Sequence, residues 1–103
     1  MIKTTTDKLL ASVVGTEDLD RAYPGIASFR GRIALDVRVD RGSLSVGKRV
    51  QLSGPRFSEP VDVVGIETVL NLEEPDVIRI LCSKPPTLYL PSGKVEGWCI
   101  AEQ

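Results

Sequence analysis

The chain contains few residues of the types that catalyse reactions or bind metals. Among its 103 residues there is no histidine, which removes the usual general base of a nucleophilic pair and the imidazole ligand of zinc sites. Glu73-Glu74-Pro75-Asp76 has the residue types of a cation or acid–base site. Adjacent carboxylates on a connecting segment do not converge on one point as such sites require, so we interpret this run as a solvated loop.

The two cysteines offer the other route to chemistry. Cys82 would become a nucleophile if Lys84 lowered its pKa, but both Cys82 and Cys99 lie in apolar segments, which favours buried, reduced thiols over a reactive thiol or a disulfide. The chain also lacks a G-x-x-x-x-G-K-[ST] phosphate loop. We therefore expect a protein that is not an enzyme and uses no metal or cofactor.

Basic side chains are concentrated in the second quarter of the chain. Residues 30–56 contain seven basic and two acidic residues, net +5, whereas residues 57–103 contain three basic and eight acidic residues, net −5. A clustered basic surface suits phosphate groups or an acidic protein face. The candidate residues are Arg32, Arg38, Arg41, Lys48, Arg49 and Arg56. The alternative is that cross-strand acidic partners cancel these charges.

A second candidate surface is apolar. Tyr89, Leu90, Pro91 and Trp98 lie near a predicted turn at residues 91–93, and aromatic side chains near turns often anchor protein interfaces. Packing in the core or at a sheet edge is the alternative role for these residues.

Alternation of apolar and polar residues predicts the strands that position these side chains. Apolar residues recur at every second position from Ile33 to Val39 and, after a turn at residues 41–43, restart over Leu44 to Leu52. The two segments predict a hairpin whose apolar residues face one interior. A bulge near Gly47 would keep Lys48 out of that interior.

The rest of the chain continues this pattern. Further strands are predicted over residues 61–70, 77–82 and 94–101. Residues 53–60 are predicted to be a loop, because they contain glycine and two prolines, and Gly65 predicts a bulge. These features predict an all-β fold, a small closed or partly closed barrel of about six strands, in a single domain of residues 1–103.

The N-terminal segment differs from the remainder. We expect residues 1–28 to be an extension of a barrel formed by residues 29–103. Asp7 and Gly15 are suitable ends for a short helix, and a second helical turn is expected before Pro24. Val13-Val14 would also suit a strand.

Composition bears on the location of the protein. No apolar run approaches the roughly 18 residues that span a bilayer, and the first residues are polar rather than those of a signal peptide. Together with the reduced thiols, these features predict a cytoplasmic protein without a membrane partner.

The segment from Arg38 to Leu52 resembles a family signature. Its sequence, RVDRGSLSVGKRVQL, is similar to the R-V-x-x-G-x-L-x-V-G-x-x-V-x-L pattern of the second, β-barrel domain of translational GTPases such as elongation factor Tu. The resemblance continues through residues 64–67 and 77–82, and Gly97-Trp98-Cys99-Ile100-Ala101 looks like the closing strand. It covers roughly residues 27–102.

The resemblance implies a barrel and leaves the ligand open. The positions at which the family binds the end of tRNA fall near Tyr23–Ile26 and Gly31, and none of them matches. We expect a non-catalytic binding module, a protein-interaction or accessory subunit, with a separately encoded GTPase or translation component as a candidate partner. The alternative is an RNA- or ribosome-binding module that uses residues 30–56.

Overall fold

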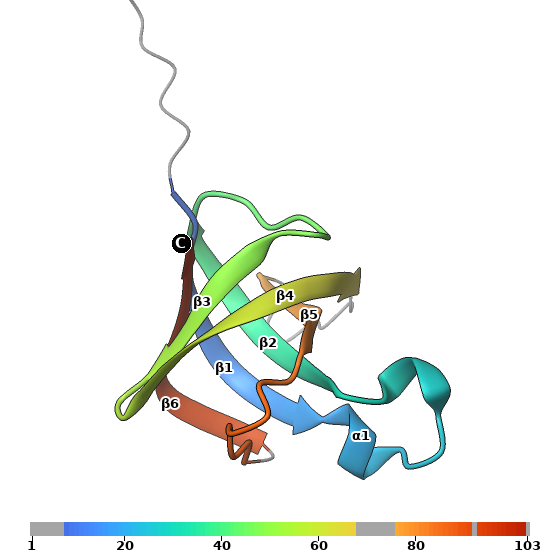
Figure 1. The fold of residues 1–103 in the computed structure, drawn as a ribbon. Coiled ribbons are helices and arrows are strands. Elements are labelled where there is room, and N and C mark those ends of the chain that lie inside the picture. Colours follow the sequence, from blue (N-terminus) through green and yellow to red (C-terminus); the bar gives the residue numbers. More distant parts are fainter. Residues whose placement is uncertain (1–7, 68–75, 92, 103) are drawn as a thin grey trace, which may run out of the picture.

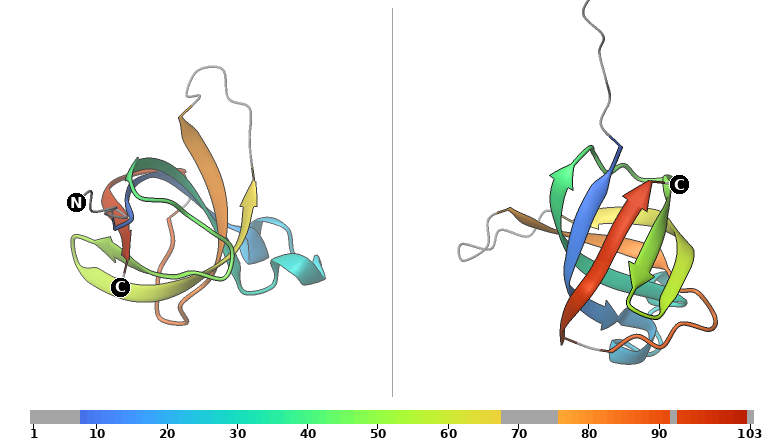
Figure 2. Two further views of the ribbon diagram at one scale, coloured as in Figure 1. Left: turned by 90° about the horizontal axis from the view of Figure 1, so that it is seen from above. Right: turned by 90° about the vertical axis from the view of Figure 1, so that its left-hand side faces the viewer.

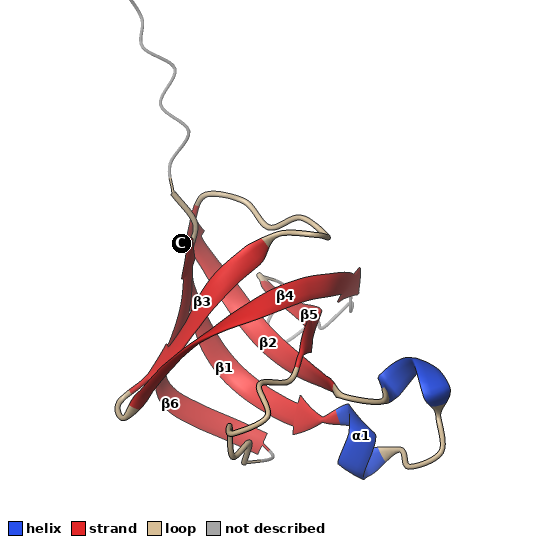
Figure 3. Cartoon of the chain, in the orientation of Figure 1, coloured by secondary structure: helices blue, strands red, loops and turns tan. Residues whose placement is uncertain are grey.

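Strands dominate the structure. The computed structural model describes residues 8–67, 76–91 and 93–102, and Figure 3 shows how little of this part is helical. In chain order its elements are β1 (Leu10–Asp18), α1 (Leu19–Ala22), η1 (Ala27–Phe29), β2 (Arg32–Arg41), β3 (Arg49–Gly54), β4 (Phe57–Glu67), β5 (Val77–Ser83) and β6 (Gly93–Glu102). None of the helices in these residues is both long enough and apolar enough to cross a membrane.

The six strands close into a barrel. Each strand is antiparallel to its neighbours, in the order β1-β2-β5-β4-β3-β6 (Figure 1; Figure 2). The all-β prediction of a small barrel is therefore confirmed. The segment that contains α1 and η1 connects β1 to β2 beside one end of the barrel (Figure 1).

Aliphatic side chains fill the interior of the barrel. They come from alternate positions of the strands, as the period of two requires, and from the segment between β5 and β6. The buried cluster consists of Leu9, Ala11, Val13, Ile33, Leu35, Val37, Val50, Leu52, Val61, Val63, Ile80, Cys82, Leu88, Leu90 and Ile100.

The helix expected over residues 7–15 is wrong, because most of this segment is strand β1. Ala11 and Val13 are buried at alternate positions, and β1 pairs with β2 on one side and β6 on the other. The barrel thus includes part of the predicted extension. Pairing along both edges of the strand outweighs a weak local preference for helix. The expected helical turn before Pro24 corresponds to α1.

The hairpin expected at residues 41–43 is also wrong. β2 lies between β1 and β5, whereas β3 lies between β4 and β6, so β2 and β3 follow one another in the chain without pairing. The connection crosses one end of the barrel (Figure 1), and Gly47 adopts a φ of +92° there. Val46 is 61% exposed instead of facing the interior.

The tight hairpin joins β3 and β4 instead. The predicted loop over residues 53–60 is mostly strand, with its turn at Pro55-Arg56. Pro60 lies opposite Gln51 of β3, and the pairs that β4 forms with β5 begin only at Val63. The proline therefore lies where the second edge of β4 needs no N–H donor. The bulge predicted at Gly65 is confirmed by a register shift between Val63 and Gly65.

Candidate functional site

The six basic candidates do not form one surface. Arg32 and Arg41 are the two ends of β2, about 30 Å apart at the usual strand rise, and Arg56 lies in the turn between β3 and β4. Within the described part of the chain, none of these three arginines forms an ion pair.

The other three basic candidates are ion-paired. Arg38 Nε lies 2.7 Å from Asp76 Oδ2, and Lys48 pairs with Glu102. Arg49 Nε lies 2.8 Å from Oδ1 of its cross-strand neighbour Asp62. The hydrogen bond from Arg49 lowers the pKa of Asp62. The cross-strand alternative describes the pair Arg49–Asp62, whereas in the other two pairs Asp76 and Lys48 lie just outside the strands.

The apolar candidates occupy three different environments. Leu90 is 3% exposed and belongs to the core, as the packing alternative proposed, because residues 88–90 alternate between the interior and solvent. The Trp98 ring packs edge-on against Phe57, with ring centroids 4.7 Å apart. Tyr89 is 77% exposed. Of the four apolar candidates, only Tyr89 exposes most of its surface to a partner, because Pro91 and Trp98 are partly buried.

The cysteine, lysine and carboxylate candidates are not arranged for a reaction. Burial raises the pKa of the Cys82 thiol to about 12, and Lys84 Nζ is held 2.7 Å from Asp18 Oδ2. Residues 73–75 of the acidic run lie outside the described residues, and Asp76 is paired with Arg38. Across residues 8–67, 76–91 and 93–102, no three cysteine or carboxylate side chains are grouped so as to hold a metal ion.

A pocket that sequence reasoning missed lies beside α1. Its volume is about 260 Å³, and we call it the α1 pocket. Strands β1, β4 and β5 contribute to one side, and the α1–η1 segment contributes Leu19, Tyr23 and Phe29. The lining residues are Glu17, Leu19, Tyr23, Phe29, Glu67, Arg79 and Leu81.

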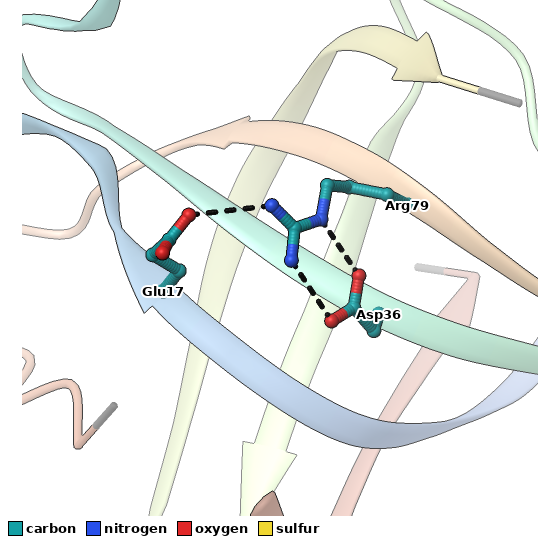
Figure 4. Close-up of polar contacts among 3 residues, drawn as sticks. All are labelled: Glu17, Asp36 and Arg79. Atoms are coloured by element: carbon teal, nitrogen blue, oxygen red, sulfur yellow. Dashed lines mark hydrogen bonds and ion pairs between the residues drawn. The ribbon is translucent and has the colours of Figure 1, made fainter. Parts of the chain in front are cut away.

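Arg79 is one of the residues that line the α1 pocket, and two carboxylates bind it (Figure 4). Arg79 Nε and Nη2 donate to the two carboxylate oxygens of Asp36 at 2.8 and 3.1 Å, and Nη1 donates to Glu17 Oε1 at 3.3 Å. The hydrogen bonds with Asp36 raise the pKa of Arg79. Asp36 faces Arg79 across the β2–β5 ladder, and the bidentate geometry is the strong form of this ion pair.

Gly15 leaves room for this cluster. It lies opposite Asp36 in the β1–β2 ladder, at a register shift of β1. A Cβ atom at this position would lie 3.2 Å from Asp36 Oδ2. The glycine therefore allows the carboxylate to approach β1 while it remains bound to Arg79.

Glu67 adds a further negative charge to the α1 pocket. It faces Arg79 across the β4–β5 ladder, is exposed, and has no ion pair among the described residues. The charged side chains that line the pocket are Glu17, Glu67 and Arg79, with a formal charge of −1, and Asp36 neutralises Arg79 from outside the lining. The electrostatic field of the pocket favours a cation.

Aromatic rings form the opposite wall. Tyr23 and Phe29 have ring centroids 5.6 Å apart and planes inclined by 56°. The segment that carries them is tied down at both ends: Asp18 accepts a hydrogen bond from the Arg21 N–H at 3.3 Å, and Asp20 accepts one from the Gly31 N–H at 3.0 Å. These hydrogen bonds fix the segment that carries the two rings, so the aromatic wall is formed without a ligand.

The residues of the α1 pocket gave no signal in the sequence, because they come from segments far apart in the chain. Glu17 and Arg79 are separated by 62 positions, and Asp36 and Arg79 by 43. Only the strand register brings them together. Comparison of this chain with protein-family models, with curated proteins and with solved structures found no match in any of the three.

Proposed function

We propose that this chain is a non-catalytic protein-binding module, an accessory subunit that contacts its partner through the α1 pocket. The observation that carries this proposal is the combination of aromatic and carboxylate groups in one preformed hollow. Aromatic side chains are enriched where protein interfaces are strongest. Tyr23 and Ile26, each 48% exposed, extend the apolar area beyond the pocket along the same segment.

The charges favour a protein over RNA as the partner. Three of the six basic candidates are in ion pairs, and the remaining three lie at separate positions on the barrel. A formal charge of −1 among the residues that line the α1 pocket disfavours phosphate groups. An acidic pocket is instead complementary to basic side chains of a protein.

The resemblance of residues 38–52 to translational GTPases supports a narrower form of the proposal. A separately encoded GTPase or another translation component is the partner class that this resemblance suggests. Cys82 and Cys99 are free thiols, which suits action in the reducing cytoplasm.

Capture from native cell extract tests the proposal. The tagged full chain should retain a protein partner after nuclease treatment, and Tyr23→Ala should reduce its recovery about tenfold, as loss of an interface anchor does. Tyr89→Ala is the matched control, because Tyr89 is an exposed aromatic residue outside the pocket. Capture that disappears with nuclease, or equal effects of the two substitutions, would contradict the proposal.

A further inference from the structure

We infer that the α1 pocket receives the side chain of an arginine from the partner protein. This inference rests on the proposed function and specifies the chemistry of the group that is recognised. It depends on the charge, the size and the aromatic wall of the pocket, which are independent observations.

The charge of the pocket selects a cation. Arg79 does not block one, because its guanidinium is already held by both carboxylate oxygens of Asp36 and by Glu17. Glu67 makes no ion pair with a described residue, so both of its oxygens are available to an incoming donor. An anionic ligand would meet the carboxylates of Glu17 and Glu67 and an arginine that is already neutralised.

The volume of the pocket is suited to one side chain rather than to a cofactor or a drug-sized molecule. Its volume of about 260 Å³ is below the roughly 300–1,000 Å³ typical of sites for cofactors and drug-sized molecules. A side chain presented by a folded partner needs less enclosure than a free ligand, because the rest of the interface supplies affinity.

The aromatic wall favours arginine over lysine. A guanidinium is planar and stacks on aromatic faces while its fork donates to a carboxylate, whereas an ammonium is a compact and strongly hydrated charge. Tyr23 and Phe29 provide the ring surfaces, and Glu67 provides the carboxylate. An arginine that enters between them can make both contacts at once.

The test uses N-acetyl-arginine-N-methylamide as the probe, titrated into the ¹⁵N-labelled full chain and followed by NMR. We expect saturable, millimolar binding with shifts confined to amides around the α1 pocket. The neutral glutamine analogue should give no saturable shifts. The lysine analogue should bind at least about threefold more weakly, since it lacks the stacked planar group.

Matched substitutions locate the site. Glu67→Gln should weaken binding of the arginine probe about threefold or more, whereas Glu96→Gln, which removes an exposed carboxylate elsewhere on the barrel, should leave it unchanged. Tyr23→Ala should weaken binding by a similar factor, and Tyr23→Phe should restore it. Thermal unfolding of each variant verifies that the barrel is intact, and Glu67 is exposed enough for its substitution to be tolerated.

The outcomes separate this inference from the proposed function. Absence of pocket shifts, equal binding of the lysine analogue, or equal effects of Glu67→Gln and Glu96→Gln would overturn the arginine inference. If partner capture still depended on Tyr23 and survived nuclease, the proposed function would stand without it. Nuclease-sensitive capture would overturn the proposed function, whatever the probe does.

Discussion

At the scale of single residues, Asp18 links three parts of the fold. It ends β1, caps α1 through the Arg21 N–H, and binds Lys84, which follows β5. The residue is only 5% exposed. Burial alone would raise the pKa of its carboxyl group, but the hydrogen bonds from Lys84 and the Arg21 N–H outweigh burial and lower the pKa overall.

Asp18→Asn should therefore change how stability depends on pH. Asparagine caps helices as well as aspartate does, so the substitution removes mainly the charge opposite Lys84, and we expect a loss of about 1–2 kcal/mol at pH 7. A carboxyl group whose pKa is lower in the folded state stabilises the fold above its unfolded pKa, and this stabilisation disappears as the pH falls through the folded pKa.

Urea unfolding of both proteins between pH 7 and pH 2 provides the measurement. The difference in unfolding free energy between wild type and Asp18→Asn should shrink below the ordinary aspartate pKa of 3.8. A difference that stays constant with pH would show that the carboxylate charge does not contribute. Asp18→Ala, which also removes the cap, should cost more at every pH.

The two cysteines should differ sharply in reactivity. The pKa of about 12 leaves Cys82 with roughly one thiolate in ten thousand at pH 8, and its side chain is fully buried. Cys99 is partly exposed. Ellman's reagent should label one thiol per native chain and two in denaturant, and Cys99→Ser should abolish the native reaction. Equal rates for both thiols in the folded protein would contradict the burial of Cys82.

At the scale of elements, the connection between β2 and β3 determines which apolar residues of segment 44–52 are buried. Val46 and Val50 have the same parity in the sequence. Val50 lies in β3 and is fully buried, whereas Val46 lies in the connection and is exposed. Alternation of apolar and polar residues therefore predicts which side chains are buried only where the backbone is paired as a strand.

Because Val50 is buried and Val46 is exposed, a charged side chain should be tolerated at position 46 but not at position 50. Val50→Glu should unfold the domain, since an unpaired buried charge costs several kcal/mol against a total stability of roughly 5–15 kcal/mol. Val46→Glu should change stability by no more than about 0.5 kcal/mol. Circular dichroism during urea unfolding measures both. A folded Val50→Glu variant, or an unfolded Val46→Glu variant, would contradict the assigned position of β3.

At the scale of the whole molecule, the strand order neutralises the uneven charge of the chain. The basic segment supplies β2 and β3, whereas the acidic segment supplies β4, β5 and β6. The barrel places β2 beside β5, and β3 between β4 and β6. Basic and acidic segments therefore alternate around much of the barrel, and ion pairs such as Arg49–Asp62 follow.

Because basic and acidic strands are interleaved, any binding to RNA should be weak and should depend only slightly on salt concentration. If only Arg32, Arg41 and Arg56 remain for phosphates, the logarithm of affinity for single-stranded RNA should fall with the logarithm of salt at a slope of about −2, whereas six contacts would give about −4. Fluorescence anisotropy with a labelled oligonucleotide measures this slope. Replacing all three arginines with glutamate should remove most of the binding, and a slope near −4 would mean that further cations also engage RNA.

The sequence by itself determined the local features of this protein. Alternation predicted β2 and β5 closely, glycine predicted the bulge at Gly65, and the spacing of strands and turns predicted a small barrel. Each of these features depends on residues that are neighbours in the chain. A period of two and the steric freedom of glycine act over a few positions, so they can be recognised before the tertiary structure is known.

Only the tertiary structure decided which strands are neighbours, and with that the candidate site. β1 became a strand because both of its edges are paired, and β2 and β3 were separated because the barrel closes through β5 and β6. The α1 pocket depends on Arg79 meeting Glu17 and Asp36 across 62 and 43 positions. Hydrogen-bond partners between strands are selected by closure of the whole chain, and no local pattern encodes that choice.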